Sequence, residues 1–194
     1  MSLASGFASA QDAEKPRTDS LDTPQARAAA KVVVAYYHAR DHFQLEKAKS
    51  LQASNLVFVG NDGTRQTANP NFLSGFMGYE KVMHGHWHCR VLGFRDGLLE
   101  AEITEENDYY RYIGSGKRIE IERFRVSDGQ IHEMTDVSLR YTGRDQDSAY
   151  REFVAWLLQL PESEREGVLR EGKLVFDADA ARRQRPLLKR FNAR

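Results

Sequence analysis

The chain has 194 residues, enough for one folded domain with a good hydrophobic core and an appendage. Hydrophobic residues make up 41% and charged residues 29%, an ordinary mix for a globular protein. Lys plus Arg and Asp plus Glu are 28 each, so no net charge draws the chain to nucleic acid or an anionic membrane, and one cysteine excludes an internal disulfide framework and a zinc ribbon.

Residues 1–22 are small and polar, which predicts a weakly ordered tail. The tail contains Ala8-Ser9-Ala10, which is similar to the cleavage site of a secretory signal, although the charged and apolar regions of such a signal are missing. The tail is therefore the remnant of a trimmed signal or an Ala- and Ser-rich extension, and a periplasmic or secreted location and a cytoplasmic one both stay open. No run of about 18 apolar residues occurs, so we expect no membrane span.

Three helices and a strand are predicted in residues 23–83. Thr23 is a good N-cap and Pro24 suits the first helical position. The spacing of apolar residues predicts helices over about 24–40, 43–51 and 71–83 and a strand over 55–59, with a short return strand after the turn Asn61-Asp62-Gly63.

Four further strands are predicted, because three turns that contain glycine separate strand-like segments. They cover about 86–94, 98–112, 117–126 and 130–141, and their short links imply a consecutive antiparallel sheet. Helix returns after Gly143, and the chain ends in a basic segment whose apolar residues predict that it docks on the domain. Acidic residues in 162–179 offset most of that basic charge, so we expect no binding to nucleic acid.

Three stretches together resemble the nuclear transport factor 2-like (NTF2-like) superfamily, which includes SnoaL-like cyclases and ketosteroid isomerases. They are AYYHARDHFQLEKAKSL followed by NLVFVGNDGT, then IERFRVSDGQI, and then EMTDV. The resemblance implies an α+β fold in which a cone-shaped, curved antiparallel sheet packs on the N-terminal helices. It thus suggests a tail (1–22), a cone domain (23–143) and a helical C-terminal extension (144–194).

The resemblance also implies a deep apolar pocket for one small apolar or aromatic ligand, and a homodimer formed through the outer face of the sheet. The side chains expected to line the pocket are Phe58, Phe76, Phe124 and Tyr36.

Candidate catalytic residues follow from the same resemblance. Glu122 in IERFRV stands where ketosteroid isomerases hold a protonated acid, and Tyr37, or Tyr36 beside it, stands where they hold an oxyanion. Asp136 in EMTDV matches the aspartate of SnoaL-like proteins and could act as a base. The structural alternatives are a Glu122 paired with neighbouring arginines on a solvated face, a core tyrosine, and an Asp136 that binds backbone amides.

In the strand predicted over 117–126, successive side chains would point to opposite faces. Alternation would place Glu120, Glu122, Phe124 and Val126 on one face, and Ile119 and Ile121 on the other.

The stretch HGHWHC, residues 84–89, is rich in possible metal ligands. On a strand, His84, His86 and His88 would share one face, with Trp87 and Cys89 on the other. His84 and His88 would be about 13 Å apart on an extended strand, so a three-histidine site is not expected. Three interpretations remain: His86 and His88 bind zinc with a nearby acid, one of them carries a proton in the pocket, or they are ordinary strand histidines.

These residues predict a small-molecule-binding protein that catalyses proton transfer (isomerisation, dehydration or cyclisation) without a cofactor or metal. The acid, base and oxyanion roles would be shared by Glu122, Asp136, Tyr37 and one of His86 and His88. The alternative is a non-catalytic ligand-binding or dimeric module of the same fold. Two departures favour it: Val59 stands near the isomerase base, and Met134 stands where a histidine is usual.

Overall fold

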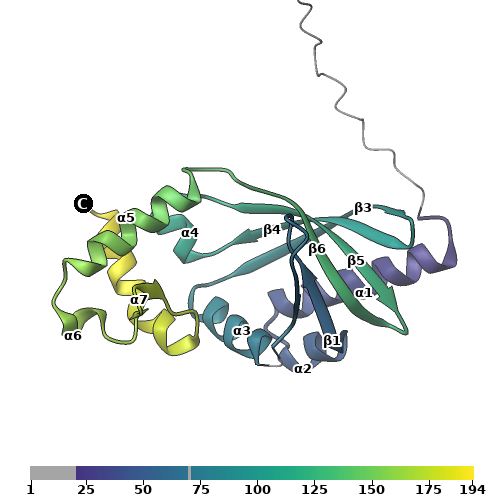
Figure 1. Cartoon of the computed structure of the whole chain (residues 1–194), viewed down its shortest axis with the longest axis horizontal. Coiled ribbons are helices and arrows are strands. Elements are labelled where there is room, and N and C mark those ends of the chain that lie inside the picture. Colours follow the sequence, from purple (N-terminus) through teal and green to yellow (C-terminus); the bar gives the residue numbers. More distant parts are fainter. Residues whose placement is uncertain (1–20, 70) are drawn as a thin grey trace, which may run out of the picture.

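The computed structural model of the chain describes residues 21–69 and 71–194, and it has an α+β fold (Figure 1). The predictions that concern residues 1–20, including the Ala8-Ser9-Ala10 site, lie outside the described residues. No helix within the two described ranges is long and apolar enough to cross a membrane.

The N-terminal elements begin close to their predicted positions. Helix α1 (Pro24–Asp41) starts after Thr23, whose side-chain oxygen accepts a hydrogen bond from the Ala26 amide at 3.1 Å. It is followed by α2 (Leu45–Ser50), β1 (Gln52–Val59), β2 (Arg65–Thr67) and α3 (Phe72–Val82).

Six strands form one twisted sheet in the order β2-β1-β6-β5-β4-β3. The last four are consecutive in the chain: β3 (His86–Arg95), β4 (Leu98–Glu106), β5 (Arg118–Ser127) and β6 (Gln130–Tyr141). Short turns join β3 to β4 and β5 to β6, whereas a longer segment connects β4 to β5. All neighbours are antiparallel except β1 and β6, which are parallel. The predicted fold class is confirmed, with this one parallel pair in a mostly antiparallel sheet.

The predicted strand over 98–112 is wrong in its second half. Strand β4 ends at Glu106, and residues Asp108–Ile113 form helix α4. The Asn107 side chain caps this helix by accepting a hydrogen bond from the Tyr110 amide at 2.9 Å, and Gly114 ends it at φ 82°. An asparagine before the segment and a glycine after it are the usual limits of a helix, and this signal was outweighed by the aromatic, strand-like residues between them.

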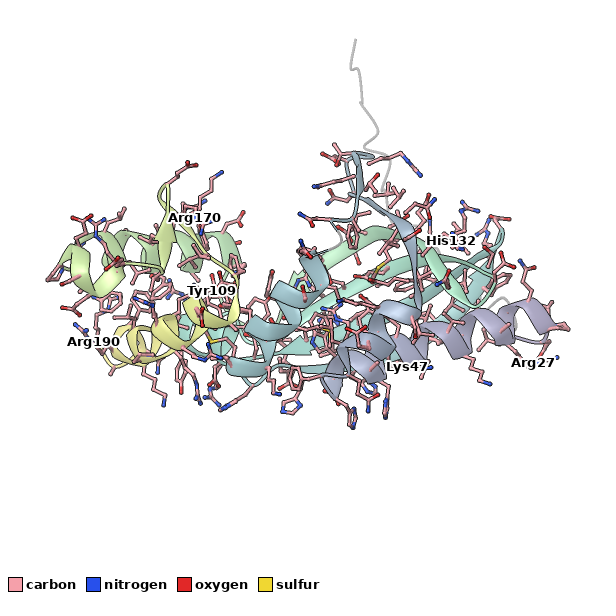
Figure 2. All side chains as sticks on the ribbon, turned by 90° about the horizontal axis from the view of Figure 1, so that it is seen from below. Arg27, Lys47, Tyr109, His132, Arg170 and Arg190 are labelled. Carbon is pink, nitrogen blue, oxygen red and sulfur yellow. The ribbon has the colours of Figure 1, made fainter. Side chains whose placement is uncertain are left out.

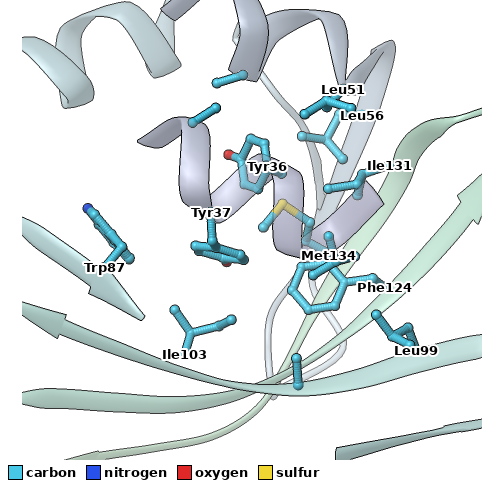
Figure 3. Close-up of a cluster of buried hydrophobic side chains, with 14 of the residues drawn as sticks. Tyr36, Tyr37, Leu51, Leu56, Trp87, Leu99, Ile103, Phe124, Ile131 and Met134 are labelled. Atoms are coloured by element: carbon cyan, nitrogen blue, oxygen red, sulfur yellow. The ribbon is translucent and has the colours of Figure 1, made fainter. Parts of the chain in front are cut away.

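Helix α1 packs on one face of the sheet, here called the inner face. It contacts β3, β4, β5 and β6, and the buried side chains between helix and sheet form the first hydrophobic cluster. Figure 3 shows Tyr37 of α1 between Trp87 of β3 and Phe124 of β5, with ring centroids 5.9 and 6.1 Å away. The inner face is therefore where the sequence candidates meet.

The C-terminal residues build a second hydrophobic cluster with α3 and α4. They form α5 (Gln146–Leu158), α6 (Glu162–Arg165), β7 (Leu169–Arg170), β8 (Lys173–Leu174) and α7 (Ala178–Asn192). In Figure 2 these helices lie at the opposite end of the molecule from the start of α1, as the labels Arg190 and Arg27 mark. The domain boundary after residue 143 and the dimer through the outer sheet face stay predictions.

Candidate functional site

Strand β5 carries the expected alternation of side chains. Glu120, Glu122 and Phe124 are buried on the inner face, with exposed fractions of 4, 7 and 0%. Ile119 and Ile121 have the opposite orientation and are only partly buried. Two carboxyl groups therefore point from one strand into the interior.

Tyr37 and Glu122 are in direct contact. The Tyr37 hydroxyl donates a hydrogen bond of 2.6 Å to Oε2 of Glu122, and both side chains are buried. Burial raises the pKa of the Glu122 carboxyl, while the hydrogen bond from Tyr37 and the charges of Arg40 and Arg118 partly offset this rise. Burial, together with the nearby Glu122, holds the pKa of Tyr37 well above its usual value, so the tyrosine keeps its proton.

Asp136 of β6 lies opposite Glu122 and completes a group of three acids. Carboxylate oxygens of Glu120, Glu122 and Asp136 all lie within 4.8 Å of one another. Glu120 and Glu122 are buried and Asp136 is exposed, so solvent reaches the group from the Asp136 side. Three carboxylates at this separation repel one another, and they cannot all ionise easily.

Arg118, at the start of β5, contacts this group of three acids. Its guanidinium bonds to Glu120 and, at 3.1 Å, to Glu105 of β4. Burial raises the pKa of Glu120 to about 8, with Arg118 opposing the rise and Glu122 and Asp136 adding to it. Burial also raises the pKa of Asp136, and Arg118 again opposes. Glu120 is therefore protonated more readily than a free glutamate, and it lies beside a more exposed carboxylate.

A second pair of buried acids lies between β4 and α3. Glu80 and Glu105 are 2 and 1% exposed, and the Asn107 amide donates a hydrogen bond of 3.0 Å to Oε1 of Glu105 and a longer one, 3.3 Å, to Oε1 of Glu80. Burial raises the pKa of both carboxyls, most strongly that of Glu80. The charge of Glu105 adds to the rise of the Glu80 pKa, so Glu80 is the more readily protonated of the two.

The side chains expected to line a pocket lie at different depths. Phe124 and Tyr36 are buried in the first cluster, and the Tyr36 hydroxyl accepts a hydrogen bond of 2.8 Å from Gln52. Phe58 lines a cavity of about 240 Å³ between β1 and α3. The Phe76 ring packs on Trp87, with centroids 6.0 Å apart.

The histidines of HGHWHC do not contribute side chains to the group of acids on the inner face. Trp87 and Cys89 face the interior, while His86 and His88 are exposed on the outer side of β3. His86 lies 3.4 Å from Asp41 at the end of α1, and His84 lies in the turn before the strand. The prediction that Trp87 and Cys89 lie on the face opposite to the histidines is correct. The alternating pattern alone did not indicate which of the two faces packs on α1.

Three residues of the site received no role from the sequence: Arg40, Arg118 and Glu120, although alternation had placed Glu120 on the same face as Glu122. Arg40 lies three residues after Tyr37, so it belongs to the buried stripe of α1, and its exposed fraction is 8%. Glu120 and Arg118 lie two and four residues before Glu122, on the same face. A charge within a buried stripe, and a second acid at spacing two, are signals that could have identified them.

The three acids could also hold a metal, because carboxylate oxygens are the donors that hard divalent cations prefer. Arg118 already supplies a positive charge to Glu120, which weakens the case for a cation there.

No protein-family model matches the sequence, and the search of curated proteins finds no match. Similar solved structures include an LEH-like epoxide hydrolase from M. tuberculosis, 16% identical, with a TM-score of 0.45 over 59% of this chain and 81% of that one. They also include an NTF2-like protein of unknown function from Cytophaga hutchinsonii, 12% identical, with a TM-score of 0.42 over 58 and 88% of the two chains. A third is a candidate ketosteroid isomerase from Kribbella flavida, 16% identical, with a TM-score of 0.45 over 80 and 96%. Of these three, the protein from Cytophaga hutchinsonii is described as NTF2-like. With TM-scores below 0.5 and identities of 12–16%, these likenesses assign no activity to this chain.

Proposed function

We propose that this protein catalyses proton transfer in a small organic molecule, without a cofactor, at the carboxyl groups of the inner sheet face. The observation that carries the proposal is the group formed by Glu120, Glu122 and Asp136, whose oxygens lie within 4.8 Å of one another. The environments of these acids differ, since two are buried and one is open to solvent. Titratable groups whose environments separate their pKa values are suited to act as acid and base.

In the proposed reaction, the Asp136 carboxylate removes a proton from a carbon next to a carbonyl group. The electron pair of that C–H bond forms a C=C bond, and the π electrons of the carbonyl move to its oxygen, which becomes an enolate oxygen. The protonated carboxyl of Glu120 or Glu122 donates a hydrogen bond or its proton to this oxygen, and Tyr37 fixes the orientation of Glu122. In a β,γ-unsaturated ketone, return of the proton from Asp136 to the γ-carbon gives the conjugated isomer. In a β-hydroxy ketone, the enolate expels the hydroxyl group, which leaves as water with the proton of the acid, and an unsaturated ketone results.

His86 and His88 have no role in this proposal, because their side chains are exposed on the other face of the sheet. Acid and base both come from carboxyl groups instead.

Deuterium exchange tests the proposal without a known product. A panel of aryl and cyclic ketones is incubated in D₂O with the protein, and incorporation next to the carbonyl is followed by mass spectrometry. General acid–base catalysis contributes about 10²–10⁴-fold, so Asp136→Asn should reduce the enzymatic exchange rate by at least about tenfold. Glu102→Gln is the matched control, because Glu102 lies on the outer face in an ion pair with Arg90. Equal exchange by the wild type and Asp136→Asn would contradict the assigned base.

A second candidate, a non-catalytic module, is supported by the saturation of the same network. Glu122 already has the Tyr37 hydroxyl as a donor and Glu120 already has Arg118, as in a purely structural arrangement. This candidate predicts no exchange above buffer with any ketone, and no dependence on Asp136.

A further inference from the structure

Arg40 is a buried cation that lacks a counter-ion in contact. It is 8% exposed, its Nε has no hydrogen-bond partner, and no carboxylate of the described residues lies within 4.0 Å of its guanidinium. Desolvating a charge is costly unless the charge is paired, and the usual partner of a buried arginine is a carboxylate or phosphate. The carboxyl groups of Glu105 and Glu122 act on this charge without direct contact, and the Nε–H group is left to donate to an anion.

Aromatic rings surround the guanidinium. Its central carbon lies 3.7 Å from the Trp87 ring centroid and 5.1 Å from that of Phe76, with Tyr37 and Tyr36 at 5.4 and 5.7 Å. Cation–π contacts hold the side chain in place and contribute about 0.5–2 kcal/mol. This is less than the cost of removing the guanidinium from water, which is several kcal/mol for a buried ion. Flat rings on several sides also favour a flat ligand beside the guanidinium.

The cavity between β1 and α3 borders this cage through residues that contact two of its rings, although Arg40 itself does not line the cavity. Gln52 lines the cavity and donates a hydrogen bond to Tyr36, one of the rings around Arg40. Phe72 lines it as well and stacks on Phe76, another ring of the cage, with centroids 5.6 Å apart. The volume of about 240 Å³ suits a ligand of one or two rings, and Lys49 adds a positive charge to its wall.

We propose that Arg40 binds the carboxylate of a small, planar, largely apolar acid, whose rings lie among the aromatic side chains of α3 and β3. A guanidinium binds a carboxylate through two parallel N–H···O bonds, which fixes both position and orientation. The proposal deepens the proposed function and rests on it, since the bound acid would be the substrate of the proton-transfer site.

The test compares two probes with the same ring system, the anion 2-naphthoate and the neutral 2-naphthamide, by calorimetric titration of the full chain. We expect the wild type to bind naphthoate at least tenfold more tightly than naphthamide. Arg40→Met, which keeps much of the side-chain volume, should bring the two affinities within twofold. The control Arg123→Met removes an exposed arginine of the outer face and should keep the preference. A wild type that binds neither probe, or binds both equally, overturns the proposal, as does a preference that survives in Arg40→Met.

A measurement on the wild type alone keeps the test valid if Arg40→Met does not fold. The chain has two tryptophans, and only Trp87 lies at Arg40, because Trp156 packs in the second cluster against Phe153 and Phe191. Naphthoate should shift the indole N–H resonance of Trp87 and leave that of Trp156 unchanged. A shift of Trp156 alone, or of neither, overturns the site. Naphthoate binding at Trp87 without ketone exchange would instead refute only the proposed proton transfer.

Discussion

Replacing Glu120 by glutamine should change how the stability of the protein depends on pH. The folded-state pKa of Glu120 is raised from 4.5 to about 8, so the unfolded chain releases this proton at a lower pH than the folded one. The protonated Glu120 therefore makes a contribution to the free energy of unfolding that is fully present below pH 4.5 and is lost as the pH rises toward 8. One proton changes stability by about 1.4 kcal/mol per pH unit, which sets an upper limit of roughly 2.5 kcal/mol between pH 5 and 7.

Neighbouring acids reduce the effect, because the proton can pass to Glu122 or Asp136. We therefore expect the stability of Glu120→Gln relative to the wild type to rise by about 1–2 kcal/mol between pH 5 and pH 7. Urea unfolding at pH 5, 6 and 7 measures this difference, and Glu102→Gln should show no such trend. A difference that stays constant within about 0.5 kcal/mol would refute the assignment of a stored proton to Glu120.

Three further outcomes follow from the contacts of the inner face. Tyr37→Phe removes the donor to buried Glu122 and should lower the free energy of unfolding by about 1–3 kcal/mol in urea titrations at pH 7; an unchanged value would mean that the bond contributes nothing. Gly85→Ala would place its Cβ against Oε2 of buried Glu80, so we expect a loss of about 1–3 kcal/mol in the free energy of unfolding, measured by thermal unfolding; wild-type stability would contradict the close packing. His88→Ala should keep the ketone exchange rate within twofold, because the side chain is exposed on the outer face, and a tenfold loss would return a histidine to the mechanism.

The sequence was most informative where local signals decide the structure. Thr23 before Pro24 marked the start of α1, and Gly97 and Gly129 marked the hairpins β3–β4 and β5–β6. The third turn with glycine, after residue 113, follows helix α4 instead of joining two strands. Alternation placed Glu120 and Glu122 on one side of β5, as the structure has them.

The site itself depended on contacts between distant residues, which the sequence does not display. Tyr37 and Glu122 are 85 positions apart, and a shift of one residue in register would have turned Glu122 outward. The side of β3 that faces α1 was equally open, so Trp87 and the histidines beside it could not be assigned. Arg40 was passed over because a charged residue at the end of an apolar stripe usually lies in solvent.

The account depends most directly on whether the acids of the inner face hold a proton at neutral pH. A ¹³C NMR titration of glutamate and aspartate side-chain carboxyls between pH 3 and 9 measures this in the wild type and in Glu120→Gln. We predict at least one glutamate carboxyl that is still protonated at pH 7, titrates near pH 8, and is absent from the spectrum of Glu120→Gln. If every carboxyl of the wild type has ionised below about pH 5.5, close to the values of free side chains, the group holds no proton to donate and the proposed acid is contradicted.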